Sequence, residues 1–382
     1  MNLLSFALSL FMTRQLNLTE LNSGSLHAAH KAFAAKLHRW DAHLHEIKEA
    51  SASASVLNPP KLLALAATPG APTRVLVVYT YAHAEWRLLN LEFFLRKGLV
   101  ARTQEGIPVD YTFVFNGEAP LCVLRDLGLR YTIVKRRDSG GDADESGDPD
   151  GDDAPGLPGQ PLISIVLREN FGFDMCASKL TLENGWSPRP GTYTRIILMN
   201  ASVRGPFMPS YASATFTWVD AFATRLGGPD GVRMVGTTIN CLSSRRDASS
   251  GAFTSLHVQS MVLALDGEGI SAIHPLLRCY NEMIEAISHG EIGATQALLA
   301  AGFSVAALQS SWRGFSVRLD NLASKEVERR CAAVADNSGG DPATPGTYLN
   351  GDLHPYEIIF IKTNRHLDES MLARITDLHN SF

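Results

Sequence analysis

Residues 168–174, which read Arg-Glu-Asn-Phe-Gly-Phe-Asp, combine groups that can bind a phosphorylated ligand. The segment follows an apolar run typical of a strand and opens a predicted helix, whose N-terminus offers backbone amides and the positive end of the helix dipole. Arg168 can pair with phosphate, Gly172 lets a ligand approach the backbone, and Asp174 can hold a ribose or cap the helix. The alternative is a capped loop whose Arg and Asp pair with each other.

A second polar segment, Asn-Ala-Ser-Val-Arg-Gly-Pro at residues 200–206, directly follows the next predicted strand. Asn200 and Ser202 can hydrogen-bond a ribose or another sugar, but without a carboxylate they bind a divalent metal ion weakly. Arg204 can supply positive charge in place of a metal. Asn200 and the Gly-Pro pair can also simply shape a turn.

Two further segments carry groups suited to hydrogen bonding and acid–base chemistry. In His-Val-Gln-Ser at residues 257–260, strand alternation would place His257 and Gln259 on one side. A satisfied internal network is the more common role of such a pair. Glu291 is expected at a helix start, where a carboxylate suits the helix dipole. Beside a sugar, the same carboxylate could act as the general base for a hydroxyl group.

Polar residues also crowd a short apolar segment near the C-terminus, at residues 354–365. His354 opens this segment, and Lys362 and Arg365 lie at its end. Either cation could close over a phosphate group, and either could equally be solvated.

The elements that must position these groups alternate between strands and helices, which predicts an α/β fold on an open, mainly parallel sheet. In such a sheet the ligand lies beyond the carboxyl ends of the strands. Strands are expected at residues 74–80, 110–115, 131–135, 162–167, 195–199 and 232–238, with a further apolar run at 258–265. Helices are expected at residues 85–97, 120–127, 174–183, 216–226, 269–288, 292–300 and 369–379, with a strand or short helix at 356–362.

The chain divides into an N-terminal part, residues 1–72, and one domain, residues 73–382. The N-terminal part has an apolar segment, an amphipathic helix at 25–50 and a linker at 51–72. Residues 138–160, rich in Asp, Gly and Pro, predict a disordered insertion. The apolar segment at 3–12 is shorter than the roughly 20 residues that a membrane-spanning helix needs. A truncated signal anchor, a weak signal peptide and an amphipathic helix remain alternatives; we favour weak membrane association in the secretory pathway, such as the Golgi, over the cytoplasm.

Composition narrows the class of protein. Hydrophobic residues make up 45% and charged residues 19% of the chain, which is typical of a soluble globular domain. The net charge of -5 gives no bulk attraction to nucleic acid, which argues against nucleic-acid partners.

The five cysteines form no C-x-x-C pair, so a structural zinc site is not expected. Most are expected to be buried as small hydrophobic residues, with at least one unpaired.

Taken in order, these segments resemble the rhamnan synthesis protein F family of glycosyltransferases. That family shows R-E-N-x-G-x-D, then N-D-S followed by G-P, then H-x-Q-S, and then a glutamate-led helix ending in Gly. The matching segments here are residues 168–174, 200–206, 257–260 and 291–302, and the resemblance spans about residues 74–310. It implies a glycosyltransferase A-type fold that transfers a sugar, often a deoxyhexose, from a nucleotide-activated donor to a glycan.

The resemblance also implies roles for individual residues. Glu291 would be the catalytic base of an inverting transfer, and residues 200–202 would occupy the place of the metal-binding D-x-D element. Because Ala201 replaces the family's Asp, dependence on Mn²⁺ or Mg²⁺, and activity itself, are in doubt. The expected donor-binding residues are Arg168, Asn170, Gly172, Asp174, Asn200, Ser202 and Arg204. The expected acceptor or phosphate contacts are His257, Gln259, His354 and Lys362.

Two other functions were weighed. A catalytically inactive relative that binds a nucleotide or glycan would keep the fold and lack turnover. A nicotinamide-dependent enzyme is disfavoured, because Thr-Tyr-Ala-His at residues 80–83 stands where G-x-G-x-x-G would follow the first strand.

Overall fold

The computed structural model describes residues 73–135, 159–242, 247–335, 338–365 and 368–381. The N-terminal part at residues 1–72 and nearly all of the predicted insertion at 138–160 therefore lie outside the described residues. In the described ranges, no helix combines the length and apolar character needed to cross a bilayer.

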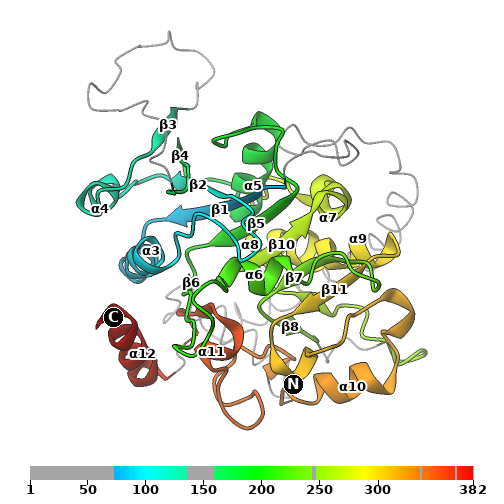
Figure 1. The fold of residues 1–382 in the computed structure, drawn as a ribbon. Helices are drawn as coiled ribbons and strands as arrows, with labels where there is room; N and C mark the ends of the chain where they lie inside the picture. Colours follow the sequence, from blue (N-terminus) through cyan, green and yellow to red (C-terminus); the bar gives the residue numbers. More distant parts are fainter. Residues whose placement is uncertain (1–72, 136–158, 243–246, 336–337, 366–367, 382) are drawn as a thin grey trace, which may run out of the picture.

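An eight-stranded sheet forms the centre of the domain, in the order β11-β7-β10-β5-β1-β2-β4-β3 (Figure 1). Every neighbouring pair is parallel except the two pairs made by β10, so the predicted open, mainly parallel α/β sheet is confirmed. The strands are β1 (Val75–Ala82), β2 (Val109–Asn116), β3 (Thr132–Lys135), β4 (Ile163–Arg168), β5 (Arg195–Asn200), β7 (Val232–Gly236), β10 (Val262–Asp266) and β11 (Ser304–Ala307). Two short ladders join β6 (Val203–Arg204) to β12 (Ile361–Lys362) and β8 (Ile239–Asn240) to β9 (His257–Val258).

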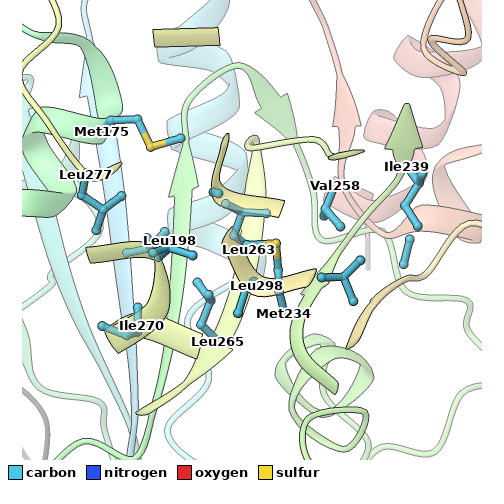
Figure 2. Close-up of a cluster of buried hydrophobic side chains, with 14 of the residues drawn as sticks. Met175, Leu198, Met234, Ile239, Val258, Leu263, Leu265, Ile270, Leu277 and Leu298 are labelled. Carbon is cyan, nitrogen blue, oxygen red and sulfur yellow. The ribbon is translucent and has the colours of Figure 1, made fainter. Parts of the chain in front are cut away.

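Helices cover both faces of the sheet, because successive strand residues point to opposite sides. Leu76 and Val78 of β1 pack with α5 (Phe173–Asn184), α7 (Gly267–Ile273) and α9 (Gly293–Ala300), on what we call the α5 face. Figure 2 shows side chains of these three helices against β5 and β10. The intervening residues Val77 and Tyr79 pack with α3 (Glu85–Lys97), α4 (Leu121–Asp126) and α6 (Trp218–Ala223) on the α3 face.

Helix α3 has the bounds that its sequence predicts. Glu85 lies in the first turn, and Arg96 and Lys97 lie in the last, which complements the helix dipole at both ends. The helix ends at Gly98, where an added Cβ would come within 2.6 Å of the Phe94 ring. Glycine is therefore needed at this position by packing.

Two predicted elements are divided in the structure. The apolar run at 258–265 is interrupted between β9 and β10, so His257 and Gln259 do not share one strand. The predicted helix at 269–288 is broken after α7 by a 3₁₀ turn (His274–Leu276), because Pro275 has no N–H to continue the ladder. Helical structure resumes with α8 (Met283–Glu285), a π-helical turn (Ala286–Ile292) and α9. Glu291 thus lies inside a helical segment, and the prediction that it starts one is wrong.

The C-terminal part packs against Phe93 of α3 and against Phe207, and its β12 pairs with β6 (Figure 1). We call residues 338–365 the C-terminal arm. It contains α11 (Pro355–Ile358) followed by β12, so the segment predicted as a strand or short helix forms both. The remaining elements are α10 (Lys325–Cys331), α12 (Glu369–Ser381) and 3₁₀ turns at Ser310–Trp312 and Leu319–Asn321.

Four of the five cysteines are paired, which corrects the expectation that most act only as small hydrophobic residues. Disulfides join Cys176 to Cys279 and Cys241 to Cys331, while Cys122 is unpaired and exposed. The partners lie 103 and 90 residues apart along the chain. Sequence spacing could not reveal these pairs, because only the fold brings their backbones together.

Candidate active site

Polar residues end three parallel strands of the sheet, of which β2 and β4 are neighbours and β5 is separated from β2 by β1. Asn116, Arg168 and Asn200 are the last residues of β2, β4 and β5. The residues two positions earlier, Val114, Val166 and Leu198, pack on the α5 face. Strand alternation therefore directs the three polar side chains to that same face, at the carboxyl edge of the sheet.

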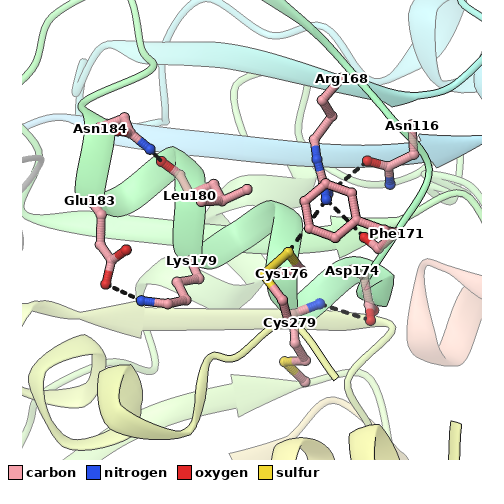
Figure 3. Close-up of a disulfide and its surroundings, with 11 residues drawn as sticks. Asn116, Arg168, Phe171, Asp174, Cys176, Lys179, Leu180, Glu183, Asn184 and Cys279 are labelled. Atoms are coloured by element: carbon pink, nitrogen blue, oxygen red, sulfur yellow. Dashed lines mark hydrogen bonds and ion pairs between the residues drawn. A yellow bond between two sulfur atoms is a disulfide. The ribbon is translucent and has the colours of Figure 1, made fainter. Parts of the chain in front are cut away.

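Arg168 is held by contacts with the end of β2 and with its own loop. Its Nη1 donates to Asn116 Oδ1 at 2.9 Å, and its Nη2 donates to the Phe171 carbonyl at 2.8 Å. The guanidinium lies 4.3 Å from the centre of the Phe171 ring, and Arg168 is only 5% exposed (Figure 3). Asn170, in the same loop, is exposed to solvent. Arg168 is therefore bonded to protein groups, although the partners are Asn116 and the Phe171 carbonyl and not the Asp of the predicted Arg–Asp pair; its phosphate-binding role stays a prediction.

Gly172 permits a close approach of the disulfide. Its φ of +72° is in the left-handed region. An added Cβ would lie 2.7 Å from Cys176 Cβ and 3.0 Å from Cys279 Cα. The glycine is thus required by the crossing of α5 and the Cys279 backbone, whatever ligand binds nearby.

Asp174, Asn200 and Ser202 form a hydrogen-bonded group that we call the strand-end cluster. Asn200 Nδ2 donates to Asp174 Oδ2 at 2.7 Å, while Asn200 Oδ1 accepts from the Ser202 N–H at 3.1 Å and from Ser202 Oγ at 2.5 Å. Burial raises the pKa of Asp174; the hydrogen bond from Asn200 opposes this shift, and the negative charge of Glu291 adds to it. The carboxylates of Asp174 and Glu291 are therefore close enough to interact.

Glu291 reaches this edge from the α5 face. It lies in the π-helical turn before α9, and such turns are frequent at functional sites because they widen the helix locally. Its Oε1 accepts a 2.7 Å hydrogen bond from the Ser260 N–H. Ser260 is at this edge because β10 is antiparallel and begins where its neighbours end.

Lys362 enters from the C-terminal arm. β12 pairs with β6, which places Lys362 opposite Val203, and the Thr363 N–H donates to the Ser202 carbonyl at 3.0 Å. Burial of the ammonium lowers the pKa of Lys362, and nearby Arg365 lowers it further. The negative charges of Glu291, Asp341 and Asp174 act on this pKa in the opposite direction, because they favour the charged ammonium.

Gln259 links the arm to the sheet. It is 3% exposed, and its Nε2 donates to Asp341 Oδ1 at 3.1 Å. Arg365 Nη2 lies 3.1 Å from Asp341 Oδ2. Burial alone would raise the pKa of Asp341, but Arg365 and Lys362 outweigh it and the pKa is lowered.

The other predicted site residues point elsewhere. Arg204 donates through Nε to Asn90 Oδ1 at 3.0 Å and through Nη1 to Thr376 Oγ1 at 3.4 Å, which joins α3 to α12. His354 is exposed and caps α11. His257 is 4% exposed, and its Nδ1 lies 2.9 Å from the Ser255 carbonyl.

Two further charged residues, Arg87 and Asp341, lie at this edge and are not predicted by any sequence pattern. Arg87, in the first turn of α3, donates to the Ala82 carbonyl at 3.1 Å. Burial lowers the pKa of Arg87, and Tyr81 and then Asp174 oppose the shift. Asp341 lies in a Gly-Gly-Asp-Pro run that predicts only a turn. No local pattern marked either residue, because their neighbours come from distant segments.

A hollow lies at the opposite edge of the sheet. Arg74, Arg102, Asp110 and Arg189 are among its lining residues. Arg74 forms an ion pair with Asp110 at 2.9 Å, and the Tyr193 hydroxyl donates to the same carboxylate at 3.1 Å. The length of the strands separates this hollow from the strand-end cluster, and the pairing of Arg74 and Asp110 indicates a structural role.

Comparisons with known proteins were made for the sequence and for the fold. No protein-family model and no curated protein matches the sequence. Among solved structures, the mannosyltransferase PcManGT from Pyrobaculum calidifontis in complex with GDP-Man and Mn²⁺ is similar with a TM-score of 0.33 and 13% identity, over 72% of this chain and 68% of that one. The bifunctional glycosyltransferase WbbM gives 0.31 and 10%, over 84% and 54%, and the mannosyltransferase Ktr4p from S. cerevisiae gives 0.27 and 8%, over 65% and 71%. All three are glycosyltransferases, although similarity at this level assigns neither a family nor a substrate.

Proposed function

We propose that this chain is a glycosyltransferase of the A type, which transfers a sugar from a nucleotide-activated donor to a glycan acceptor with inversion. One observation carries the proposal. Asp174 and Asn200 are bonded to each other, Glu291 is bonded to Ser260 beside the end of β5, and Lys362 lies on β12, which pairs with β6 just after β5, so three distant segments meet at the carboxyl edge of the sheet. That edge is where open α/β sheets bind their ligands.

In the proposed reaction Glu291 takes the proton of an acceptor hydroxyl. The hydroxyl oxygen forms a bond to the anomeric carbon from the face opposite the diphosphate. The bond from that carbon to the diphosphate oxygen breaks, and its electron pair leaves with the nucleoside diphosphate. The configuration at the anomeric carbon is inverted, and the proton remains on Glu291 until solvent removes it.

The surroundings of Glu291 suit a general base. The Ser260 N–H holds Oε1 and so orients the carboxylate. Among the described residues, no hydrogen-bond donor is assigned to Oε2, which is left to accept a proton. A held but incompletely bonded carboxylate is the arrangement that general-base catalysis requires.

The strand-end cluster would hold the donor. Asp174 can accept hydrogen bonds from ribose or sugar hydroxyls, and Ser202 can donate one. Because Arg168 and Arg204 are bonded within the protein, we assign them to the support of the site. The resemblance to the rhamnan synthesis protein F family suggests a deoxyhexose donor.

A donor screen with detection of products by mass spectrometry tests the proposal. Glu291→Gln keeps an oxygen for the Ser260 N–H and removes the base, so transfer should fall by about 10²- to 10⁴-fold with donor binding unchanged. Glu285→Gln, in the preceding α8, is the matched control and should retain activity. Undiminished transfer by Glu291→Gln would remove Glu291 from the base role.

A nucleotide- or glycan-binding protein without turnover is the second candidate. It is favoured by Ala201, which stands where a metal-binding carboxylate would lie. Calorimetry with nucleotide sugars, run beside the product assay, separates the two functions. Binding without product from any donor and acceptor supports the second candidate.

The two disulfides bear on the compartment. Disulfides persist in oxidising environments and are rare in the cytosol. Cys176–Cys279 and Cys241–Cys331 therefore support the secretory pathway, including the Golgi. Membrane association through residues 3–12 stays part of the proposal.

A further inference from the structure

The end of β5 offers poor ligands for a divalent cation. A backbone N–H can only donate, so the Asn200 atom that faces the Ser202 N–H must be the amide oxygen. The amide nitrogen consequently faces Asp174. One of its hydrogens is donated to the carboxylate that would have to bind the metal, and hard cations require oxygen ligands there.

The remaining carboxylates do not complete a cation site. Glu291 is oriented by the Ser260 N–H, and Asp341 is bonded to Gln259, Ala343 and Arg365. Across the described ranges, no three His, Cys, Asp or Glu side chains are arranged to hold a metal ion. The residues at this edge therefore do not fit Mn²⁺ or Mg²⁺.

Lys362 is held beside the strand-end cluster by its backbone. The β6–β12 ladder and the bond from the Thr363 N–H to the Ser202 carbonyl set the arm against residues 202–204. The buried Asn90 reinforces this contact, since its Nδ2 donates both to the Ala201 carbonyl at 3.0 Å and to Thr363 Oγ1 at 2.8 Å. The position of Lys362 is thus preorganised relative to Asp174 and Asn200.

The Lys362 ammonium group differs in its contacts from the guanidinium groups of the site. Arg168, Arg204 and Arg365 each make hydrogen bonds to protein groups. Among the described residues, by contrast, the Lys362 ammonium has neither a hydrogen bond nor an ion pair within 4.0 Å, although the charges of Glu291, Asp341 and Asp174 act on its pKa. An ammonium carries three rotatable donors and binds phosphate as a point charge.

From this arrangement we infer that Lys362 takes the place of a divalent cation, so that the site binds a nucleoside diphosphate without metal. The inference rests on the proposed function and deepens it. Departure of the nucleoside diphosphate adds negative charge to its terminal phosphate oxygen, and the ammonium would donate a hydrogen bond to this oxygen while it keeps its own proton. A fixed donor aimed at developing charge is a common source of catalysis.

Titration calorimetry of the full chain, with its disulfides intact, tests the inference with GDP and UDP as probes. Each titration is run in EDTA and again in Mn²⁺. We expect at least one nucleotide to bind with the same Kd in both conditions, within about twofold. Lys362→Met should weaken binding by about 10- to 100-fold, because it removes a hydrogen bond to a charged group.

Two variants serve as controls. Lys362→Arg keeps the positive charge and should recover most of the affinity. Lys325→Met, at an exposed position in the first turn of α10, should leave the Kd unchanged. Thermal unfolding of each variant shows whether a weakened Kd reflects a loss of fold.

The outcomes separate this inference from the proposed function. Binding that requires Mn²⁺ and is lost in EDTA overturns the role of Lys362 and leaves a glycosyltransferase intact. Equal affinity of folded Lys362→Met and wild type also overturns it. If neither nucleotide binds in either condition, the proposed function is contradicted, and this inference, which rests on it, is contradicted as well.

Discussion

Two carboxylates at the same edge of the sheet, the half-buried Asp174 and the buried Asp341, differ in the sign of their pKa shift. Asp174, in the strand-end cluster, has only neutral hydrogen-bond donors and lies near Glu291, so burial dominates and its pKa is raised. Asp341, in the C-terminal arm, is buried, but Arg365 and Lys362 outweigh the effect and its pKa is lowered. The hydrogen-bond donors to Asp174 are thus neutral, whereas the arm brings two cations, Arg365 and Lys362, to Asp341.

The difference indicates how the site is assembled. The strand-end cluster follows from the sheet, because strand alternation and parallel register direct Asn200 toward the start of α5. The arm contributes only through long-range contacts, namely β12 against β6 and Asn90 against Thr363. Each region also has a disulfide nearby, Cys176–Cys279 under the strand-end cluster and Cys241–Cys331 before the arm, where the Cys241 N–H donates to the Gly340 carbonyl.

Removal of each disulfide should destabilise mainly the region that lies beside it. Cys176→Ser with Cys279→Ser, and Cys241→Ser with Cys331→Ser, should each cost about 2–5 kcal/mol of unfolding free energy. The costs should be similar, because the bridged residues lie 103 and 90 positions apart. Urea denaturation under non-reducing conditions measures them.

Amide hydrogen exchange then shows which backbone segments lose protection in each double variant. Loss of Cys176–Cys279 should deprotect the first turn of α5, whereas loss of Cys241–Cys331 should deprotect the end of α10 and the start of the arm. The same pattern of deprotection in both double variants would contradict the division into two regions.

One glycine in each region can be replaced by alanine to compare how tightly the two regions are packed. Gly172→Ala forces a left-handed Ala and also overlaps the disulfide, so we expect a loss of about 2–5 kcal/mol, the sum of conformational strain and overpacking. Gly346 in the arm has the same φ of +72°, but no atom lies within 4 Å of an added Cβ. Gly346→Ala should therefore cost only the conformational part, about 1–2 kcal/mol. Chemical denaturation compares the two; equal losses would show that the overlap at Gly172 is relieved by movement.

The contact between the regions can be weakened with Thr363→Val. This change removes the hydroxyl that accepts from the buried Asn90 Nδ2 while the bond to the Ala201 carbonyl remains. We expect a loss of about 1 kcal/mol in thermal or urea unfolding. Thr363→Ser retains the hydroxyl and should be near wild type; equal losses in both variants would assign the effect to packing of the methyl group.

The smallest expected effect is a difference in pH dependence. Because the folded-state pKa of Asp174 is raised above the ordinary 3.8, its contribution to stability is present below that value and is lost as pH rises through the folded-state pKa. The unfolding free energy of Asp174→Asn should therefore increase relative to that of wild type as pH rises through the folded-state pKa of Asp174. For Asp341 the pKa is lowered, so its contribution is present above 3.8 and is lost as pH falls through the folded-state pKa.

Asp341→Asn should accordingly lose stability relative to wild type at neutral pH and approach it in acid. Urea denaturation of the three proteins between acid and neutral pH gives both differences. If the difference in unfolding free energy from wild type changed with pH in the same direction for both variants, the opposite pKa shifts of Asp174 and Asp341 would be contradicted.

The sequence by itself determined the strands that build the sheet except β11, the bounds of α3, and the placement of Asn200 and Asp174 at strand and helix ends. These features depend on local periodicity and on the direction of parallel strands, both of which are written in neighbouring residues. The tertiary structure alone decided that β10 runs antiparallel, that Glu291 lies in a π-helical turn, that four cysteines pair, and that Lys362 and Asp341 join the site. Each of these depends on contacts between residues far apart in the chain, whose free energy arises only when the fold has closed the distance between them.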